Sequence, residues 1–517
     1  MEFMSAVRQT LNNELNVSVT ENGAVGYRTT GKELLDLNFA VASLRKMSDQ
    51  EVANRFMKAF CEDKLLAMKW LFYARDIRGG VGERRLFRVV LKGLVQSNPE
   101  MVIPVINLIP EYGRYDDLWC LLDHDSAAYA VYQFVDKQLK QDWESMAAGK
   151  PISLLAKWMP SINASSAQTK EYGKKLCKAL NMTEREYRKA LSKLRKYLDV
   201  VEIKMSDKNW SEIKYEAVPS RANLIYNSAF LRNDETRRRE YLSKLEKGET
   251  KINAGTLFPH DIVHKYMNSG YYSRSLKGKD ATIEALWKAL PNTVNDCGNT
   301  IVVADGSGSM CCNVDHNSSV TALEVANALA IYFAERSSGQ FKDKYITFSE
   351  RPQLVDMSNC NTLHSKLQKA LAHSEVANTN IEKVFDLILT TAVANHMAQE
   401  DLPKNVLIIS DMEFDSCATC GVSSGWGINR PNKKLFDVIA QKYAAHGYKL
   451  PRLVFWNVNS RTGTIPVKEN DLGVALVSGF SVNIAKMVMS GKTDPYECLL
   501  ETLNSERYAP VEEALTW

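Results

Sequence analysis

From about Pro291 onward, short runs rich in β-branched and aromatic residues alternate with longer amphipathic runs. The short runs predict buried strands over 300–304, 344–349, 406–410, 453–458 and 474–477, and the longer runs predict helices over 320–335, 362–372, 381–395, 433–446 and 481–488. Strands that alternate with helices form a mainly parallel sheet covered on both faces. The sequence therefore predicts a doubly wound α/β domain over residues 291–517.

The first 290 residues follow a different pattern, in which apolar residues recur three and four positions apart. This periodicity predicts helices over 50–60, 65–76, 83–94, 101–109, 115–122 and 129–144. Turn-forming residues such as Gly79-Gly80 and Pro110 separate them. Successive helices with short links are typical of stacked helical pairs, as in an α-solenoid, although no clean internal repeat is visible. We therefore expect an all-α domain over residues 1–290.

Charge is divided unevenly between these two halves. The whole chain carries a formal net charge of +4, but the residues before Pro291 sum to about +10 and the rest to about −6. A basic half favours a polyanionic partner, although the excess is moderate for its length.

The ten cysteines are scattered and form no dense framework, which is typical of free thiols in a reducing compartment. No apolar run reaches the roughly 18 residues that a transmembrane helix needs. The first residues lack the basic-then-apolar order of a secretory leader. We therefore expect an intracellular, cytoplasmic protein without a membrane partner.

Oxygen-bearing side chains follow three of the expected strands or links. Asp305-Gly306-Ser307-Gly308-Ser309 comes directly after the first strand, Thr379 precedes the helix at 381, and Asp411 follows the strand 406–410. The carboxyl ends of parallel strands share one edge of a sheet, where such proteins bind ligands. Carboxylate and hydroxyl oxygens are ligands that Mg²⁺ or Mn²⁺ prefers. The sequence thus predicts one divalent cation held by Asp305, Ser307, Ser309, Thr379 and Asp411.

Each part of this pattern also has an ordinary structural explanation. Gly/Ser-rich turns follow many strands, and an Asp at a strand end often caps the next helix. The combination favours a metal site, because a buried strand precedes the loop, a helix follows it, and two further donors stand at suitable distances along the chain.

The run Val302-Val303-Ala304-Asp305-Gly306-Ser307-Gly308-Ser309-Met310 resembles the metal-ion-dependent adhesion site (MIDAS) of von Willebrand factor A domains. Thr379 is similar to that family's second motif and Asp411 to its third. The resemblance covers roughly residue 295 to the C-terminus. It implies a metal ion with an open coordination position, which an acidic side chain, a phosphate or another anion of a partner fills. A site of that kind binds its ligand and does not break bonds.

A helical half followed by an A-type domain resembles the layout of the Ro autoantigen (TROVE) proteins. Arg78-Gly79-Gly80-Val81-Gly82-Glu83-Arg84-Arg85 resembles the Gly/Arg turn of that family. Segments 113–119, 157–161 and 187–191 resemble an uncharacterised related family found in bacteria, viruses and plants. The resemblance implies a HEAT-like helical solenoid or ring that forms ribonucleoproteins with small structured RNAs and binds the ends of misfolded RNAs.

Basic side chains in the helical half are candidates for contacts with RNA phosphates, which would make binding sensitive to salt. The candidates are Arg78, Arg84, Arg85, Arg88, Lys174, Lys175, Arg188, Lys189, Lys193, Arg195 and Lys196. The alternative is a set of solvated surface helices with local ion pairs, such as Glu184 with Arg188.

Cys417 and Cys420 have the spacing of half a zinc site. The other half would have to come from Cys311, Cys312 or His316, and free thiols in loops are the simpler interpretation. We therefore expect no zinc. Neither a catalytic triad order nor a phosphate-binding Gly-Lys-Ser/Thr loop is recognisable, so we expect no enzymatic activity.

The leading hypothesis is an RNA-binding scaffold similar to the Ro proteins. Its basic helical half would bind small structured or single-stranded RNA, and its metal site would bind an acidic partner or an anion. The alternative is a protein–protein adaptor that uses the metal to recognise an acidic partner residue without RNA. A metal-dependent hydrolase is the third and weakest possibility.

Overall fold

The computed structural model describes residues 3–4, 7–8, 11, 15–269, 274–294, 299–348, 351–373, 378–416, 422–425, 428–431, 434–485, 487 and 492–516. It is rich in helices and carries a six-stranded mixed sheet in its C-terminal part, which confirms the expected combination of a helical part with an α/β part. No helix among these residues is long and apolar enough to cross a membrane.

Contacts divide the chain into two compact units. The sheet unit comprises residues 1–51 and 257–502, and the helical unit comprises residues 52–256 and 503–517. The predicted domains met at residues 290 and 291 instead. The difference arises because residues before 52 and after 256 pack with the sheet, while the last 15 residues pack with the helices.

The six strands of the sheet lie in the order β12-β11-β8-β5-β6-β7. Their bounds are β5 (Thr300–Asp305), β6 (Lys344–Phe348), β7 (Gln353–Asp356), β8 (Asn405–Ser410), β11 (Arg452–Asn457) and β12 (Val474–Ser478). The five expected strands are therefore confirmed, and they are parallel to one another. Strand β7, which the sequence did not predict, pairs antiparallel with β6 at the edge of the sheet.

Helices cover both faces of this sheet. Phe455 and Trp456 are neighbours in β11 and therefore point to opposite faces. The Trp456 ring meets Phe333 of α18 (Ala322–Ala334) at 5.2 Å, and the Phe455 ring meets Phe436 of α21 (Leu435–Ala445) at 5.0 Å. Helix α18 thus lies on one face and α21 on the other, which gives three layers.

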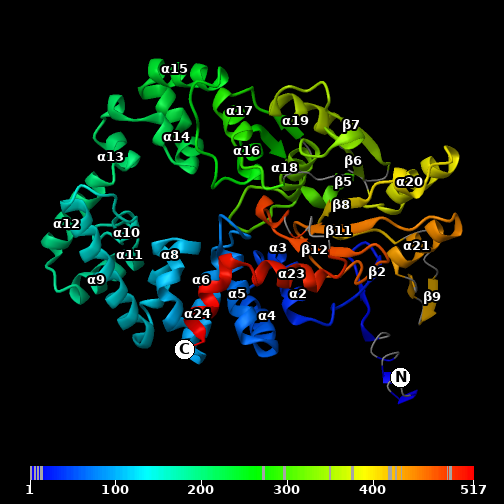
Figure 1. Ribbon diagram of the computed structural model, residues 1–517, viewed down its shortest axis with the longest axis horizontal. Coiled ribbons are helices and arrows are strands. Elements are labelled where there is room, and N and C mark those ends of the chain that lie inside the picture. Colours follow the sequence, from blue (N-terminus) through cyan, green and yellow to red (C-terminus); the bar gives the residue numbers. More distant parts are fainter. Residues whose placement is uncertain are drawn as a thin grey trace. The chain divides into compact units, whose positions relative to one another are not determined.

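The further elements of the sheet unit are α2 (Glu33–Phe39), α3 (Val41–Leu44), α16 (Pro259–Tyr266), β3 (Met267–Ser269), β4 (Arg274–Leu276), α17 (Ala281–Lys288), α19 (Leu363–Ala372), α20 (Glu382–Ala394), β9 (Val422–Gly425), β10 (Ile428–Pro431), η8 (Val482–Ile484) and α23 (Pro495–Leu503). Helices α16 and α19 contact α18, and α20 contacts α21 (Figure 1). Within the helix expected over 481–488, the structure describes η8 and helical residues at 485 and 487, while residues 486 and 488 lie outside the described ranges.

Residues 16–47 precede the helical unit in sequence but pack on the sheet. A two-stranded hairpin, β1 (Ser18–Val19) with β2 (Val25–Gly26), is followed by backbone hydrogen bonds in both directions between Tyr27 and Ile465. Further along, Asn457 donates to the carbonyl of Phe39 at 2.8 Å. We call residues 16–30 the strap. Its attachment explains why the sheet unit begins at the start of the chain.

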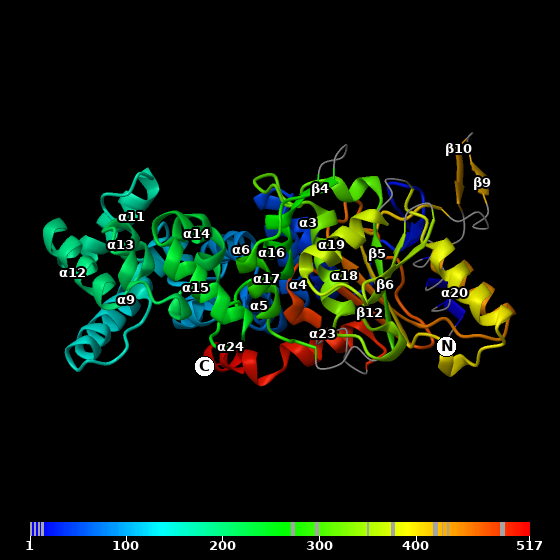
Figure 2. The same ribbon diagram turned by 90° about the horizontal axis from the view of Figure 1, so that it is seen from above.

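The helical unit contains α4 (Asp49–Glu62), α5 (Lys64–Arg75), α6 (Arg85–Ser97), α7 (Pro99–Val102), η1 (Ile103–Leu108), α8 (Ile109–Tyr112), η2 (Tyr115–Leu121), α9 (Asp125–Ala147), α10 (Leu155–Trp158), α11 (Ala167–Ala179), α12 (Glu184–Tyr197), α13 (Val201–Ser206), η3 (Trp210–Glu212), η4 (Tyr215–Ala217), α14 (Ser220–Asn233), α15 (Glu235–Glu246) and α24 (Ala509–Leu515). The expected helix 115–122 is a 3-10 helix, and the expected helix 101–109 is split into shorter turns. Helices α9 and α12 lie side by side (Figures 1 and 2).

The segments 113–119, 157–161 and 187–191 contact one another inside the helical unit. The indole of Trp119 donates to the carbonyl of Trp158 at 3.0 Å, and the guanidinium of Arg114 stacks 4.0 Å above the Trp158 ring. The hydroxyl of Tyr187 donates to the carbonyl of Pro160 at 2.9 Å. These three sequence segments therefore form one packed cluster, although they are far apart along the chain.

Candidate metal site at the carboxyl edge of the sheet

The loop that follows β5 turns back on the carboxylate at the strand end. The amide of Ser307 donates to Asp305 at 2.9 Å, and the amide of Gly306 donates to the carbonyl of Phe348 at 3.0 Å, which anchors the loop to β6. The hydroxyl oxygens of Ser307 and Ser309 lie 3.0 Å apart. The two-residue spacing in Asp-Gly-Ser-Gly-Ser thus gathers three oxygen-bearing side chains on one short turn.

Asp411 reaches the same turn from the neighbouring strand. Strand β8 pairs with β5, and the hydroxyl of Ser410 at its end donates to Asp305 at 2.6 Å. Asp411 accepts a hydrogen bond from the Ser309 side chain. Both carboxylates are almost completely buried, with Asp305 1% and Asp411 0% exposed. Sheet register alone therefore brings these two acids to one place.

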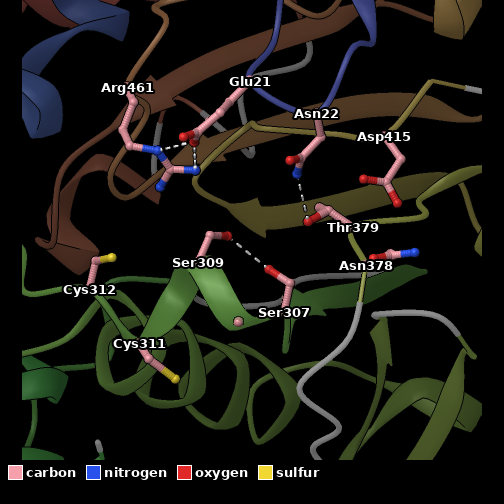
Figure 3. A pocket seen from close by; sticks show the side chains of 11 residues that line it. Glu21, Asn22, Ser307, Ser309, Cys311, Cys312, Asn378, Thr379, Asp415 and Arg461 are labelled. Atoms are coloured by element: carbon pink, nitrogen blue, oxygen red, sulfur yellow. Dashed lines mark hydrogen bonds and ion pairs between the residues drawn. The ribbon is translucent and has the colours of Figure 1, made fainter. Parts of the chain in front are cut away.

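Thr379 arrives from the link before α20. Its carbonyl accepts from the amide of Asp415 at 2.9 Å, and its hydroxyl accepts a long hydrogen bond of 3.4 Å from Asn22. Together with Ser307 and Ser309 it lines a cavity of about 490 Å³ (Figure 3). The structure thus brings all five predicted ligands to one edge of the sheet.

The donor set of this edge fits a divalent cation. Burial, and then the neighbouring Asp411 carboxylate, raise the pKa of Asp305. Burial likewise raises the pKa of Asp411, against the opposing effect of Arg461. Two carboxylates buried side by side with one guanidinium nearby leave negative charge that a cation would offset. Among the described residues, this edge included, no group of three or more His, Cys, Asp or Glu side chains is placed to hold a metal ion, so the candidate site depends on two carboxylates and three hydroxyls.

Sequence reasoning missed several residues that line the same cavity, and three of them come from segments far from the predicted ligands. Glu21 and Asn22 come from the strap, and Arg461 comes from the loop after β11 (Figure 3). Arg461 donates to Asp411 at 3.0 Å and also forms an ion pair with Glu21. No local motif marks these side chains, because they reach the site only when segments about 440 residues apart pack together.

A further buried acid, Glu413, organises the loops around the cavity. One of its oxygens accepts from the amide of Arg461 at 2.7 Å and the amide of Thr462 at 2.8 Å, and the other accepts from the amide of Glu21 at 2.8 Å. Glu413 therefore ties the strap and the Arg461 loop to the end of β8.

Of the residues considered for zinc, Cys417 and Cys420 lie outside the described residues. Cys311 and Cys312 are free thiols that line the cavity. The ring of His316 lies 3.2 Å from the carbonyl of Lys46. The expectation that no zinc binds stays a prediction.

Three of the basic residues considered for RNA are only partly exposed, and their side chains are engaged within the helical unit. Arg88 pairs with Asp116 and Asp117. Lys175 pairs with Asp123 and Glu171. Arg195 donates to the carbonyls of Ala156 and Met159, both at 2.8 Å, and to Ser161 at 3.1 Å, so it fixes the 156–161 turn.

The remaining candidates are exposed. They are Arg78, Arg84 and Arg85 near the start of α6, and Lys174, Arg188, Lys189, Lys193 and Lys196 on α11 and α12. We call the latter five the α11–α12 basic surface. Lys193 also lies 5.2 Å from the centre of the Trp143 ring. The structure therefore leaves eight of the eleven candidates on the surface.

Comparison with known proteins gives matches along most of the chain. Residues 299–512 match the domain of unknown function DUF7788, and residues 20–111 and 114–300 match the domain of unknown function DUF2828. An uncharacterised protein of Acanthamoeba polyphaga mimivirus, L728, is 29% identical over 542 residues, which cover 96% of this chain and 89% of the viral protein. Because the DUF2828 match spans more than half of the residues of this chain, the chain belongs to the DUF2828 family, whose function is unknown.

Proposed function

We propose that the sheet unit is a von Willebrand factor A-type domain that binds one Mg²⁺ or Mn²⁺ ion and, through it, an acidic group of a partner. One observation carries the proposal: two buried carboxylates and three hydroxyls from separate links meet at the carboxyl edge of the sheet. Hard oxygen donors of this kind suit either ion.

Asp305, Ser307, Ser309, Thr379 and Asp411 would hold the ion. When bound, it would supply a positive centre that attracts a carboxylate or phosphate. The protein buries the two carboxylates, and the cavity lined by Ser307, Ser309 and Thr379 opens the site to solvent. We propose binding and no catalysis, which is the role that the resemblance to A-type domains implies. Glu413, for its part, is held by three backbone amides and so is poorly suited to act as a base.

Calorimetric titration of the purified protein with Mg²⁺ and Mn²⁺ tests this proposal. We expect one site per chain, weakened at least about tenfold in Asp305→Asn. The matched control is Asp471→Asn, which changes an exposed acid of the same unit. Absence of a metal-dependent heat from the wild-type protein, or equal affinities for both variants, would contradict the proposal.

A second candidate function concerns the helical unit, which we propose to be a HEAT-like, TROVE-like RNA-binding scaffold. The observation that favours it is the α11–α12 basic surface, where five cationic side chains are exposed on two adjacent helices. Exposed cations at this spacing suit the phosphates of a structured or single-stranded RNA. The chain would then act in the cytoplasm as part of a ribonucleoprotein.

Gel-shift titrations with a small structured RNA over a range of salt concentrations test RNA binding. Replacing Lys174, Arg188, Lys189 and Lys193 by Gln should weaken binding and flatten its salt dependence, by roughly 0.7–0.9 in the log–log slope for each phosphate that the variant no longer neutralises. The control replaces four exposed lysines of the sheet unit, Lys342, Lys369, Lys404 and Lys449, by Gln. Equal slopes for both variants would count against this surface.

The adaptor alternative makes a different prediction for the purified protein. If partners are recognised by the metal site alone, no RNA copurifies and the ratio of absorbance at 260 to 280 nm stays that of pure protein. A high ratio that falls after ribonuclease treatment favours the scaffold.

A further inference from the structure

The strap borders the candidate metal site and is held there by its backbone and by the side chains of Thr20 and Asn22. Asn22 donates to the carbonyl of Glu413 at 2.6 Å, and Thr20 donates to the carbonyl of Phe414 at 2.6 Å. Gly23 forms a β-bridge with Asp415. None of these contacts uses the side chain of Glu21, so the strap remains attached whatever that side chain does.

The side chain of Glu21 is directed to Arg461 (Figure 3). Arg461 therefore has an acid on either side, Glu21 from the strap and Asp411 from the end of β8. The two acids differ in freedom: the Asp411 side chain is 0% exposed, whereas that of Glu21 is 56% exposed. Of the two ion pairs, the one with Glu21 can open without disturbing the core.

We propose that Glu21 is a built-in competitor for the acidic ligand of this site, and that Arg461 is the side chain for which they compete. The inference rests on the proposed metal-dependent function and names the residues that control it. An incoming carboxylate would bind the metal and Arg461 together, and Glu21 would swing out into solvent. A guanidinium suits this role because it presents several donors to one carboxylate.

If Glu21 acts through its charge, removing that charge should change metal affinity and anion affinity in opposite directions, which a purely structural role would not do. Glu21 adds a negative charge beside the cation, so removing it should weaken metal binding. The same removal frees Arg461, so it should strengthen binding of an anion once the metal is bound. Removing the positive charge of Arg461 should have the opposite effects. It should strengthen metal binding and weaken anion binding, because a positive charge opposes a cation and attracts an anion.

Two titrations of the full-length protein test this. The first measures Mg²⁺ affinity, and the second measures the affinity of N-acetyl-glutamate N-methylamide, which has one free carboxylate, at saturating Mg²⁺. For Glu21→Gln we expect Mg²⁺ to bind about three- to tenfold more weakly and the capped glutamate to bind more tightly by a similar factor. The control is Glu33→Gln, an exposed acid of the same unit, which should change neither value.

A second variant, Arg461→Gln, should bind the capped glutamate at least about tenfold more weakly and Mg²⁺ more tightly. Circular dichroism in Mg²⁺ checks that both variants are folded. If Glu21→Gln weakens both ligands, or leaves the affinity of the capped glutamate equal to that of the control, the competitor role is wrong. If either of these outcomes is found while the wild-type protein binds one Mg²⁺ ion as proposed, only the role of Glu21 is wrong. If it binds no Mg²⁺, the proposed function fails as well.

Discussion

Buried carboxylates are compensated in two different ways in this protein. In the helical unit, Asp117 is 0% exposed and accepts from Arg75 at 2.8 Å, from Arg88 at 2.6 Å and from the amide of Arg114 at 3.0 Å. At the sheet edge, by contrast, Asp411 pairs with Arg461, whereas the buried Asp305 beside it accepts from neutral donors, the amide of Ser307 and the hydroxyl of Ser410. The first cluster is complete without a ligand, whereas the second has an excess of negative charge.

The Asp117 cluster should be important for stability. Asp117→Asn leaves Arg75 buried without its counter-charge, so we expect the free energy of unfolding of the helical unit to fall by about 3–5 kcal/mol. Urea denaturation followed by circular dichroism measures this. The control is Asp136→Asn, which breaks an exposed pair with Lys140 and should cost about 0.5 kcal/mol or less. Similar losses in both variants would contradict this account of the cluster.

The candidate metal site should show the reverse behaviour in the absence of metal. In EDTA, Asp305→Asn removes repulsion between two buried acids, so we expect the sheet unit to melt at a higher temperature than the wild-type protein. Added Mg²⁺ should stabilise the wild-type protein and leave the variant unchanged. Differential scanning fluorimetry with and without Mg²⁺ measures both effects. A variant that melts lower than the wild-type protein in EDTA would show that the hydrogen bonds of Asp305 with Ser307 and Ser410 outweigh the repulsion between the two acids.

The sequence revealed the residues that depend on local spacing and missed those that depend on tertiary contact. The Asp305 loop could be predicted because its turn and its strand are contiguous, and Asp411 because strand ends align in a parallel sheet. Glu21 and Arg461 could not, because nothing near either of them in sequence indicates their meeting. Arg195 is one of the predicted RNA contacts, yet its side chain holds a turn of the neighbouring segment.

At the scale of elements, the turn between α5 and α6 depends on a glycine. A Cβ added at Gly80 would lie 2.0 Å from the carbonyl oxygen of Tyr73, which accepts the amide of Val81. Gly93 lies within α6, and a Cβ there would meet no atom within 4 Å. Backbone packing alone therefore requires glycine at position 80, so this glycine has a structural reason that is independent of nucleic-acid binding.

These two glycines give a matched pair of substitutions. We expect Gly80→Ala to destabilise the helical unit by about 1–3 kcal/mol, because backbone must move to admit the methyl group. Gly93→Ala should stabilise it by about 0.5–1 kcal/mol, through the higher helix propensity of alanine. Chemical denaturation of both variants gives the values. Effects of equal sign would contradict the packing described for this turn.

Elements with strong periodicity were predictable, and short or irregular ones were not. The strands β5 and β11 are buried throughout, β8 is buried after its first residue, and the central residues of all three form apolar runs. Strand β7 has only four residues, of which Val355 alone is buried, so its sequence resembles a loop. The segment Tyr115–Leu121 has helical spacing but winds as a 3-10 helix, a difference that apolar periodicity cannot resolve.

At the scale of the whole molecule, composition changes near residue 291 but packing does not divide there. Helix α2 contacts β12, and α16 contacts α18, so residues from before the predicted boundary cover the sheet unit. In the helical unit, α24 contacts α5 and η1, and Arg507 donates to Asp76 at 2.6 Å. Sequence periodicity reports the type of each element but not the partner on which it packs.

This arrangement predicts how fragments behave. Residues 257–502 expressed alone lack the segment that covers β12 and borders the site, so we expect little soluble protein and a low melting temperature. Co-expression with residues 1–51 should restore both, with the two fragments eluting together in size-exclusion chromatography. Equal solubility and stability with and without residues 1–51 would contradict the assignment of the strap to the sheet unit.

The central claim is that oxygen donors from three separate links hold one cation at the edge of the sheet. The most direct measurement is an anomalous difference map from a crystal of the full-length protein soaked in Mn²⁺. We expect one strong peak within about 2–2.5 Å of oxygens of the Asp305 loop, absent in crystals of Asp305→Asn. A map without a peak there at saturating Mn²⁺, or a peak that persists in Asp305→Asn, would contradict the claim.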